Sequence, residues 1–245
     1  MMKRPNKAIL DGDILVWKTA FWADTEGVDS ITPKLRYLVR KWTPKDIDKV
    51  EVALSCKRRE NFRMEAYPQY KSNRDGTFKP ETLYDTYEIV QDLFKCLKRP
   101  CLEADDIMGI YASCGKAIAV STDKDMRGVN GWHWNPTKED EPACISRADA
   151  ERFFCIQWMA GDPTDGVPGL WRVGHKKAAK MLDEWETDEW HSKIMKAYTK
   201  EKYHKEPVDN PEQLAIATGQ CVRILHKENF NLRTNKITPW VPKVG

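Results

Sequence analysis

Acidic residues recur along this chain in four short clusters, and most of them follow apolar runs directly. The eight carboxylates are Asp11, Glu103, Asp105, Asp106, Asp123, Asp125, Asp162 and Asp165. Asp11 ends the run Ala8–Leu10, and Asp123 and Asp125 follow the run Ala117–Thr122. An acidic residue just past an apolar strand lies at the carboxyl edge of a sheet, where open α/β folds place their sites. The clusters therefore predict one acidic site built from distant parts of the chain.

Converging carboxylates repel one another and do not all stay ionised unless cations neutralise them. Hard oxygen ligands in this number suit Mg²⁺ or Mn²⁺, and such a cluster is the usual setting for two-metal phosphoryl chemistry. Each cluster alone has a simpler interpretation. Asp105 and Asp106 could form the acidic first turn of a helix, and Asp162 and Asp165 could be loop residues beside Pro163. The metal-site interpretation rests on all the clusters together.

The composition is that of an ordinary globular chain of 245 residues, 41% hydrophobic and 31% charged. No stretch is apolar for long enough to span a bilayer. Asp11 and Asp13 interrupt the apolar run that a signal peptide would need after the basic N-terminus. We therefore expect a cytoplasmic protein with no membrane partner. The seven cysteines show no Cys-x-x-Cys spacing, so we expect them to be reduced and mostly buried.

The net charge of +3 is small, but the positive charge is unevenly distributed. Residues 57–79 carry seven lysines and arginines against three acidic residues. A second basic set follows the last acidic cluster and consists of Arg172, Lys176, Lys177 and Lys180. Basic flanks around an acidic centre fit a polyanion held beside a metal site. A solvated surface remains the simpler interpretation of either basic run alone.

The first half of the chain alternates predicted strands and helices. Residues 8–16 and 49–56 have the apolar, β-branched composition of buried strands. Helices are predicted at 32–42, 80–97 and 103–114, with a further strand at 117–122. Strands that alternate with helices predict a mainly parallel α/β sheet.

The second half is predicted to be mainly helical. Ser146, with Asp149 three residues later, is a capping-box signal for a helix that ends at Ala160. The segment 161–174 is rich in Gly and Pro, which predicts a tight loop. Further helices are predicted at 175–186, 188–203 and 211–227, and residues 127–145 are expected to be irregular or to form short strands.

Two patterns outside the acidic clusters could bind phosphate. The loop-rich stretch Tyr70–Arg74 supplies Lys71 and Arg74, and cations near a metal site could stabilise charge on a reacting phosphate. The step from Val173 to Lys177 passes from a loop into a predicted helix. The free backbone N–H groups of a helix start bind phosphate without reading sequence.

Taken in order, these motifs resemble those of the 5′-nuclease (flap endonuclease) family. They are Ile9-Leu10-Asp11-Gly12, Tyr70-Lys71-x-x-Arg74, Glu103-Ala104-Asp105-Asp106, Ser121-Thr122-Asp123-Lys124-Asp125 and Gly161-Asp162-x-x-Asp165-Gly166-x-x-Gly169-x-x-x-x-Gly174. The chain looks most like the 5′→3′ exonucleases of short-tailed bacteriophages, which degrade duplex DNA from 5′ ends and remove RNA primers during replication. The resemblance extends from about residue 8 onward and includes the segment Gly219–Leu225.

The resemblance implies an α/β fold with a PIN-like core, a mainly parallel sheet and a helical part. The core would occupy residues 1–145, with a basic arch or loop at about 57–82 through which a 5′ single strand passes. The helical part would occupy residues 146–245 and hold duplex DNA with a helix–three-turn–helix element at about 151–186. The two parts would form one compact nuclease unit.

Carried over by position, the resemblance also implies roles for individual residues. The eight carboxylates match metal-site acids that hold two Mg²⁺ ions, with Mn²⁺ as a substitute, and Lys71 and Arg74 match catalytic cations. DNA contacts are expected from Tyr70, Arg172, Gly174, His175, Lys176 and Lys177. The implied substrates are double-stranded DNA with 5′ ends or flaps and RNA–DNA hybrids, within the host cytoplasm if a phage encodes the chain. No protein partner is predicted.

Two positions depart from the family pattern. Many relatives carry an Asp after the second strand, where this chain has Cys56, and a thiol is a poor Mg²⁺ ligand. The turn Gly169–Gly174 carries Trp171 and Arg172 where small or apolar residues are common. Some relatives bind K⁺ through backbone carbonyls of this turn, and K⁺ is left open for this chain.

The acidic core leaves two other functions open. A PIN-type ribonuclease would share the carboxylates but would not need the hairpin at 161–174. A catalytically silent DNA-binding relative would keep the fold, and Cys56 is the only residue that supports it. The eight intact acids favour a metal-dependent 5′→3′ exonuclease.

Overall fold

The computed structural model describes residues 2–243, and a six-stranded sheet in the order β3-β2-β1-β4-β5-β6 lies at its centre. The strands are β1 (Lys7–Asp11), β2 (Lys49–Leu54), β3 (Cys96–Lys98), β4 (Ile118–Val120), β5 (Gly131–Trp134) and β6 (Ala143–Ile145). Neighbouring strands pair in parallel except for β5 with β6. The predicted mainly parallel α/β sheet is thus confirmed.

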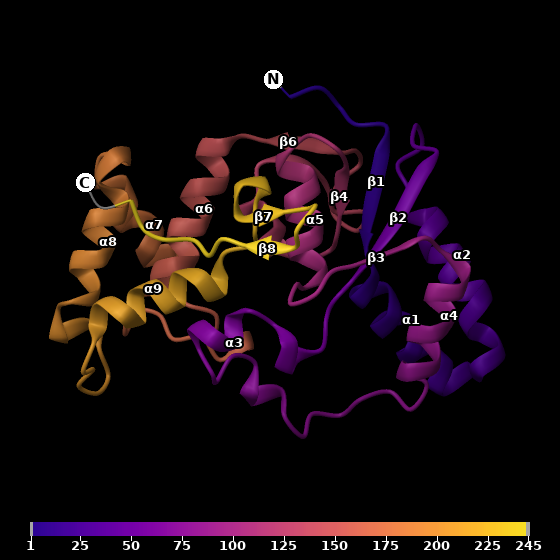
Figure 1. The fold of residues 1–245 in the computed structure, drawn as a ribbon, viewed down its shortest axis with the longest axis horizontal. Coiled ribbons are helices and arrows are strands. Elements are labelled where there is room, and N and C mark those ends of the chain that lie inside the picture. The colour runs from indigo at the N-terminus through magenta and orange to yellow at the C-terminus, as the bar shows by residue number, and fades with distance from the viewer. Residues whose placement is uncertain (1, 244–245) are drawn as a thin grey trace.

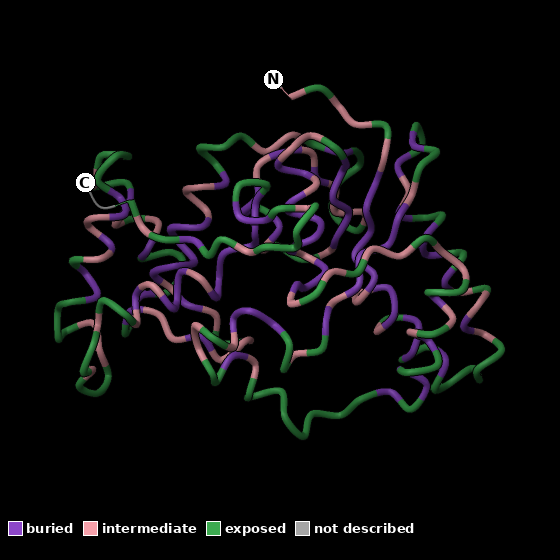
Figure 2. The backbone as a smooth tube through the Cα atoms, viewed as in Figure 1, coloured by how far each residue is buried: buried purple, intermediate pink, exposed green. Residues whose placement is uncertain are grey.

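Helices cover both faces of this sheet (Figure 1). On one face lie α1 (Gly12–Glu26), α2 (Ile31–Lys41) and α4 (Leu83–Leu93), and on the other lies α5 (Ala104–Ser113). Successive strand residues point to opposite faces, so Leu10 packs with α1 while Ile9 packs with α5. Burial on both faces makes the central strands the most enclosed part of the chain, as Figure 2 shows.

The order of the strands creates a crevice at the carboxyl edge of the sheet. β2 lies on one side of β1 and β4 lies on the other, with Leu10 opposite both Val52 and Val120. The connections after β1 and after β4 therefore run in opposite directions across the sheet. Open α/β sheets bind their ligands at such a switch point.

The remaining helices form a second apolar core. They are α6 (Arg147–Ala160), α7 (His175–Asp183), α8 (Trp190–Tyr198) and α9 (Pro211–Val222). Trp158 is fully buried among them, and its indole N–H donates to the Ala215 carbonyl at 2.6 Å. The short hairpin of β7 (Phe230–Asn231) and β8 (Lys236–Ile237) packs beside α5. The predicted helix is confirmed in that α6 ends at Ala160 and Ser146 caps its start by accepting the Asp149 N–H, without the reciprocal bond of a capping box.

The first predicted strand, 8–16, is wrong in its second half. The strand ends at Asp11, and the apolar residues that follow belong to α1. The Asp11 side chain caps this helix by accepting the Ile14 N–H at 3.1 Å. Gly12 is required at the turn, because a Cβ there would lie 2.4 Å from the Ala53 carbonyl oxygen.

The predicted helix at 80–97 is wrong at both ends. Helix α4 spans Leu83–Leu93, and Leu97 lies in β3. The helix ends early because the chain after it pairs with β2. Val52 of β2 donates its N–H to the Lys95 carbonyl at 3.0 Å, and the following residues form β3.

The segment 57–82, here called the arch segment, includes one short helix, α3 (Arg63–Ala66). From α3 it runs along the lower edge of the molecule to α4 (Figure 1). Its residues between 71 and 79 are almost all exposed (Figure 2). Among residues 2–243, no helix combines the length and the apolar character required to cross a bilayer.

Candidate active site

A pocket of about 270 Å³ lies at the carboxyl edge of the sheet, where β1 and β4 end. Seven of the eight predicted carboxylates line it, together with both predicted catalytic cations. The acids are Asp11, Glu103, Asp105, Asp123, Asp125, Asp162 and Asp165, and the cations are Lys71 and Arg74. We call this the acidic pocket. The structure thus brings together residues that are up to 154 positions apart in the sequence.

Ser121 links the acids at the ends of the two central strands. Its hydroxyl donates to Asp11 Oδ2 at 2.7 Å and accepts the Asp123 N–H at 3.0 Å. Asp123 in turn accepts the Asp125 N–H at 2.9 Å. These bonds fix the carboxylates of β1 and β4 at the switch point of the sheet.

The electrostatics of the acidic pocket favour a bound cation. Burial, with Asp13 close by, raises the pKa of Asp11 to about 7. Burial and the neighbouring Asp123 raise the pKa of Asp125 to about 6, and burial with Glu103 raises that of Asp105. Asp125 Oδ1 is buried without a hydrogen-bond partner among the described residues. Crowded oxygens of this kind fit a hard divalent ion.

Glu103 is held in its charged form by cations. Burial alone would raise its pKa, but Lys71 and Arg63 outweigh burial and lower the pKa to about 2. Lys71 Nζ contacts Glu103 and lies 3.5 Å from Asp165 Oδ2. Burial opposes the charge on Lys71 too, yet the two carboxylates raise its pKa overall. Lys71 is therefore a fixed positive charge inside the acidic pocket.

The arch segment is tied to the loop that carries the last acidic cluster. Lys71 donates its N–H to the Asp165 carbonyl at 2.8 Å, and Arg74 forms an ion pair with the Asp165 carboxylate. Arg58 donates to the Lys71 carbonyl at 2.7 Å. Lys71 has a φ of 57°, a left-handed conformation that costs a non-glycine residue about 1 kcal/mol or more. The contacts around Lys71 hold it there, which places its ammonium in the pocket.

Asp106 does not line the acidic pocket, which corrects its assignment as a metal ligand. Its two oxygens accept hydrogen bonds from Arg63 at 2.7 and 2.8 Å, and Leu225 donates its N–H to it at 3.0 Å. Glu103 precedes α5 as its N-cap, so Glu103 and Asp106 form a capping box and do not share one helical face. Asp106 is a fully buried ion-pair partner that joins α5 to α3.

Tyr70 differs from its expected place, and Cys56 lies outside the acidic pocket. Tyr70 is 2% exposed, which excludes the predicted contact of its ring with DNA. Its hydroxyl donates to Glu103 at 2.8 Å, so it positions an acid of the pocket. Cys56 is buried, and burial raises the pKa of its thiol to about 12. Ser55, and not Cys56, lines the acidic pocket.

Asp13 and Ser55 also line the acidic pocket, although neither is among the predicted site residues. Asp13 accepts the Tyr87 hydroxyl at 3.0 Å and the Ser55 N–H at 3.3 Å, and burial raises its pKa. The Ser55 hydroxyl bonds to Asp13 and accepts the Ala104 N–H at 2.9 Å. Asp13 lies in the first turn of α1. Its place in the pocket was not predicted because residues 12–16 were expected to continue the first strand.

The start of α7 lies beside the acidic pocket. Gly174 is its N-cap, and His175, Lys176 and Lys177 are exposed on its first turn. The pKa of His175 is lowered by burial and by Lys124, with Asp162 acting in the opposite direction. Both of these charged residues line the acidic pocket. The predicted DNA contacts of Arg172 and of this helix start stay predictions.

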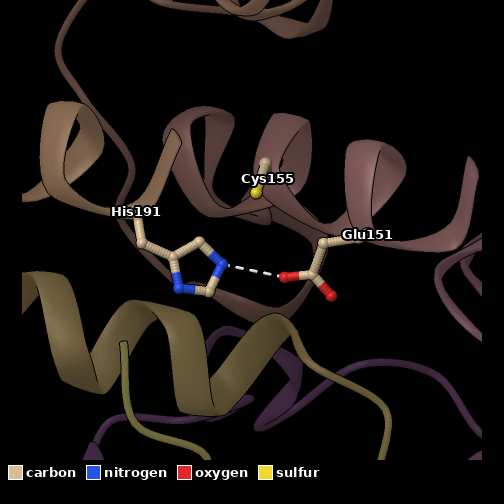
Figure 3. A group of neighbouring side chains, drawn as sticks. All are labelled: Glu151, Cys155 and His191. Atoms are coloured by element: carbon tan, nitrogen blue, oxygen red, sulfur yellow. Dashed lines mark hydrogen bonds and ion pairs between the residues drawn. The ribbon is translucent and has the colours of Figure 1, made fainter. Parts of the chain in front are cut away.

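A second group of ligand-type side chains lies in the helical core and consists of Glu151, Cys155 and His191 (Figure 3). His191 Nδ1 accepts the Lys243 N–H at 2.9 Å, so its proton lies on Nε2 and is donated to Glu151 at 2.8 Å. Arg223 lies 3.3 Å from the other Glu151 oxygen. The imidazole nitrogens and the carboxylate are thus already engaged. Burial raises the pKa of Cys155, so its thiol is protonated beside this pair.

Comparison with known proteins bears on the identity of this site. The model of the 5′-3′ exonuclease N-terminal resolvase-like domain matches residues 7–138. An exodeoxyribonuclease of Enterobacteria phage T3 is 27% identical over 213 residues, which cover 75% of this chain and 70% of that protein. The flap endonuclease Xni of Shewanella baltica is 31% identical over 139 residues, which cover 50% of this chain and 52% of that protein.

A similar fold occurs among solved structures. The structure of the T5 5′-exonuclease with bound divalent metal ions (zinc) has a TM-score of 0.62 at 18% identity, over 88% of this chain and 89% of that chain. The family match spans more than half of the 245 residues and includes all the pocket acids up to Asp125. The resemblance inferred from the motif order is thereby confirmed. The chain belongs to the family of 5′-3′ exonuclease N-terminal resolvase-like domains, and it is a 5′ nuclease.

Proposed function

We propose that this chain is a Mg²⁺-dependent 5′→3′ exonuclease that hydrolyses duplex DNA from 5′ ends and removes the RNA strand of hybrids. The observation that carries the proposal is the meeting of seven predicted acids with Lys71 and Arg74 in one pocket. The T3 relative is an exodeoxyribonuclease, and the Shewanella relative is a flap endonuclease. A role in phage DNA replication and in flap cutting follows by analogy with these relatives.

The acids divide into metal holders and a charge partner. Two ions would be held by the carboxylates that follow the strand ends, that lie in the first turn of α5 and that lie in the 162–165 loop, which are Asp11, Asp105, Asp123, Asp125, Asp162 and Asp165. Bound there, divalent ions supply stabilisation of phosphoryl charge and activation of the attacking water. Glu103 is different, because Lys71 and Arg63 lower its pKa to about 2, whereas burial keeps the pKa of Asp165 raised despite its contacts with Lys71 and Arg74.

Lys71 and Arg74 act on the phosphate in this proposal. Both contact Asp165 without substrate, so the carboxylate keeps them at the pocket wall. A phosphodiester that enters the pocket offers oxygens that compete for the same cations, and charge-assisted hydrogen bonds to phosphate are strong. The two side chains then offset the charge that develops on the phosphate as the bond breaks.

Duplex DNA would be held by the start of α7 and by the arch segment. Lys176 and Lys177 are exposed beside free backbone N–H groups, which is an arrangement that binds backbone phosphates. A 5′ single strand would lie along the arch segment, where Lys57, Arg58, Arg59, Arg74 and Lys79 line a cavity of about 730 Å³. The DNA duplex and its 5′ end are thus held on two sides of the acidic pocket.

The test compares the polarity and the substrate of cleavage. Duplex DNA labelled at the 5′ or the 3′ end is incubated with the protein and Mg²⁺, alongside an RNA–DNA hybrid and a single-stranded RNA. Short labelled products should appear first from the 5′-labelled strand of the duplex and from the RNA strand of the hybrid. Degradation that begins only at 3′ ends would refute the proposal. Cleavage confined to single-stranded RNA would instead establish a PIN-type ribonuclease.

A further inference from the structure

A second cavity opens beside the acidic pocket, under β4, β5 and β6. Its volume is about 390 Å³, and Asp123 and Lys124 line both spaces. His133 of β5 lines the cavity next to Ala119 of β4, its partner in the sheet. The space, here called the β4–β6 cavity, therefore adjoins the place where the proposed cleavage occurs.

His133 is a buried polar side chain whose hydrogen-bonding capacity is not met within the described residues. It is 7% exposed, neither ring nitrogen makes a hydrogen bond of good geometry there, and the Val129 backbone offers only a weak one. Burial lowers the pKa of this imidazole to about 4, against a weaker effect of the Val129 backbone, so the ring is neutral at pH 7. A buried polar group left unsatisfied costs about 1–3 kcal/mol. A neutral imidazole offers one donor and one acceptor to a ligand that enters the cavity.

The rim of the β4–β6 cavity carries positive charge. Arg127 and Lys138 line it, and neither forms an ion pair with any residue between 2 and 243. Lys124 lies 3.8 Å from Asp125 and reaches both spaces. Glu139 and Asp123 also line the cavity, and Trp134 borders it at the end of β5, with its ring packed toward the α1 face of the sheet. Cations without ion pairs near a buried imidazole match the phosphate and the base edge of a nucleotide.

We propose that the β4–β6 cavity binds a nucleoside monophosphate, either the nucleotide next to the scissile phosphate or the same nucleotide after release. Arg127 and Lys138 hold its phosphate, and His133 bonds to the base edge. The inference rests on the proposed nuclease function and names a site for the nucleotide that is cut. It also explains why an otherwise unsatisfied histidine lies beside the acidic pocket.

The test measures binding by calorimetry in EDTA, so that no cleavage occurs. The probes are deoxyadenosine monophosphate, inorganic phosphate and deoxyadenosine. The proteins are the parent, Arg127→Ala with Lys138→Ala, and a control with Arg36→Ala and Arg40→Ala, which removes the same charge from the exposed face of α2. The monophosphate should bind the parent more tightly than either fragment. The first variant should bind it about tenfold or more weakly, since hydrogen bonds to charged groups contribute at least that factor, and the control should bind like the parent.

A second variant, His133→Phe, tests the base contact. It should weaken binding of the monophosphate and leave binding of inorganic phosphate unchanged, with its fold checked by circular dichroism. A 5′-phosphorylated duplex then identifies the source of the nucleotide. Weaker duplex binding by the Arg127/Lys138 variant supports a site for the substrate strand. A site for the product is supported if this variant binds duplex as the parent does but its cleavage of DNA in Mg²⁺ is no longer inhibited by the monophosphate.

Two results would overturn the inference. One is equal affinity of the monophosphate for the parent and for the Arg127/Lys138 variant, and the other is binding of the monophosphate no tighter than that of inorganic phosphate. Cleavage of duplex DNA in Mg²⁺ is measured in parallel. If the parent protein cuts DNA but binds no monophosphate, only the nucleotide site in the β4–β6 cavity is refuted. If the parent protein cuts no DNA, the proposed function is refuted.

Discussion

Replacing Asp11 with Asn should stabilise the metal-free protein, and more so at pH 8 than at pH 5. Burial and the nearby Asp13 raise the pKa of Asp11 from 3.8 to about 7. A carboxyl group whose pKa is higher in the fold than in the unfolded chain binds its proton more tightly in the fold. Its contribution to stability is therefore full below pH 4 and is lost as the pH rises toward 7. An Asn side chain cannot ionise and escapes this loss.

The size of the effect follows from the two pKa values. The raised pKa lowers the free energy of unfolding by about 2 kcal/mol at pH 5, where only the unfolded chain ionises Asp11, and by about 4 kcal/mol at pH 8, where the fold ionises it too. Asn keeps an oxygen that can accept the Ile14 N–H, and any weakening of the contact with Ser121 is the same at both pH values. The variant should therefore gain about 2–3 kcal/mol more stability over the parent at pH 8 than at pH 5.

Urea unfolding in EDTA at the two pH values measures this difference. A matched control is Asp92→Asn, which removes an exposed carboxylate from α4 and should show no such pH dependence. Adding Mg²⁺ at pH 8 should stabilise the parent more than the Asp11 variant, because a ligand stabilises the state that binds it. A stability difference between parent and variant that is equal at pH 5 and pH 8 would refute the electrostatic reasoning.

Four variants test other parts of the protein. Asp123→Asn should abolish cleavage in Mg²⁺ and leave duplex affinity largely unchanged in a filter-binding assay, and a variant that still cuts would remove Asp123 from the metal holders. Lys176→Ala with Lys177→Ala should weaken duplex binding. It should also reduce the steepness of the plot of log binding constant against log salt concentration by about one per lost phosphate contact, and an unchanged slope would show that the start of α7 does not bind DNA phosphates. Cys56→Ser should cut at close to the parent rate, because the thiol lies outside the acidic pocket, and a large rate loss with an intact circular dichroism spectrum would show otherwise. Arg63→Met should lower the free energy of unfolding by about 3–5 kcal/mol, because it leaves the buried Asp106 unpaired, and a loss below 1 kcal/mol in urea unfolding would contradict that pairing.

The sequence predicted the acidic site well where strand ends fix the position of a side chain. Asp11 and Asp123 follow buried strands, and parallel strands bring their carboxyl ends to one edge. Asp125 continues the same turn, and its backbone bond to Asp123 places it beside the first acid. Such positions depend on local pattern and sheet geometry, which a single sequence carries.

Tertiary contacts decided the positions that the sequence did not predict. Glu103 and Asp106 were both expected to be metal ligands, but α5 begins after Glu103, and Asp106 is buried in an ion pair with Arg63. Tyr70 was expected to face DNA and is buried because its hydroxyl bonds to Glu103 and Asp165. The division of the chain at residue 145 and the helix–three-turn–helix role of α6 and α7 stay predictions.

The most direct test of the central claim is a Mn²⁺ titration of the metal-free protein, followed by electron paramagnetic resonance. If strand ends and loops build one metal-binding pocket, the parent should bind two ions per chain. The variant with Asp11→Asn and Asp125→Asn should keep its circular dichroism spectrum and lose most of this binding, while a control with exposed Asp46→Asn and Asp92→Asn should bind as the parent does. Mn²⁺ uptake by the Asp11/Asp125 variant equal to that of the parent would contradict a metal site in the acidic pocket.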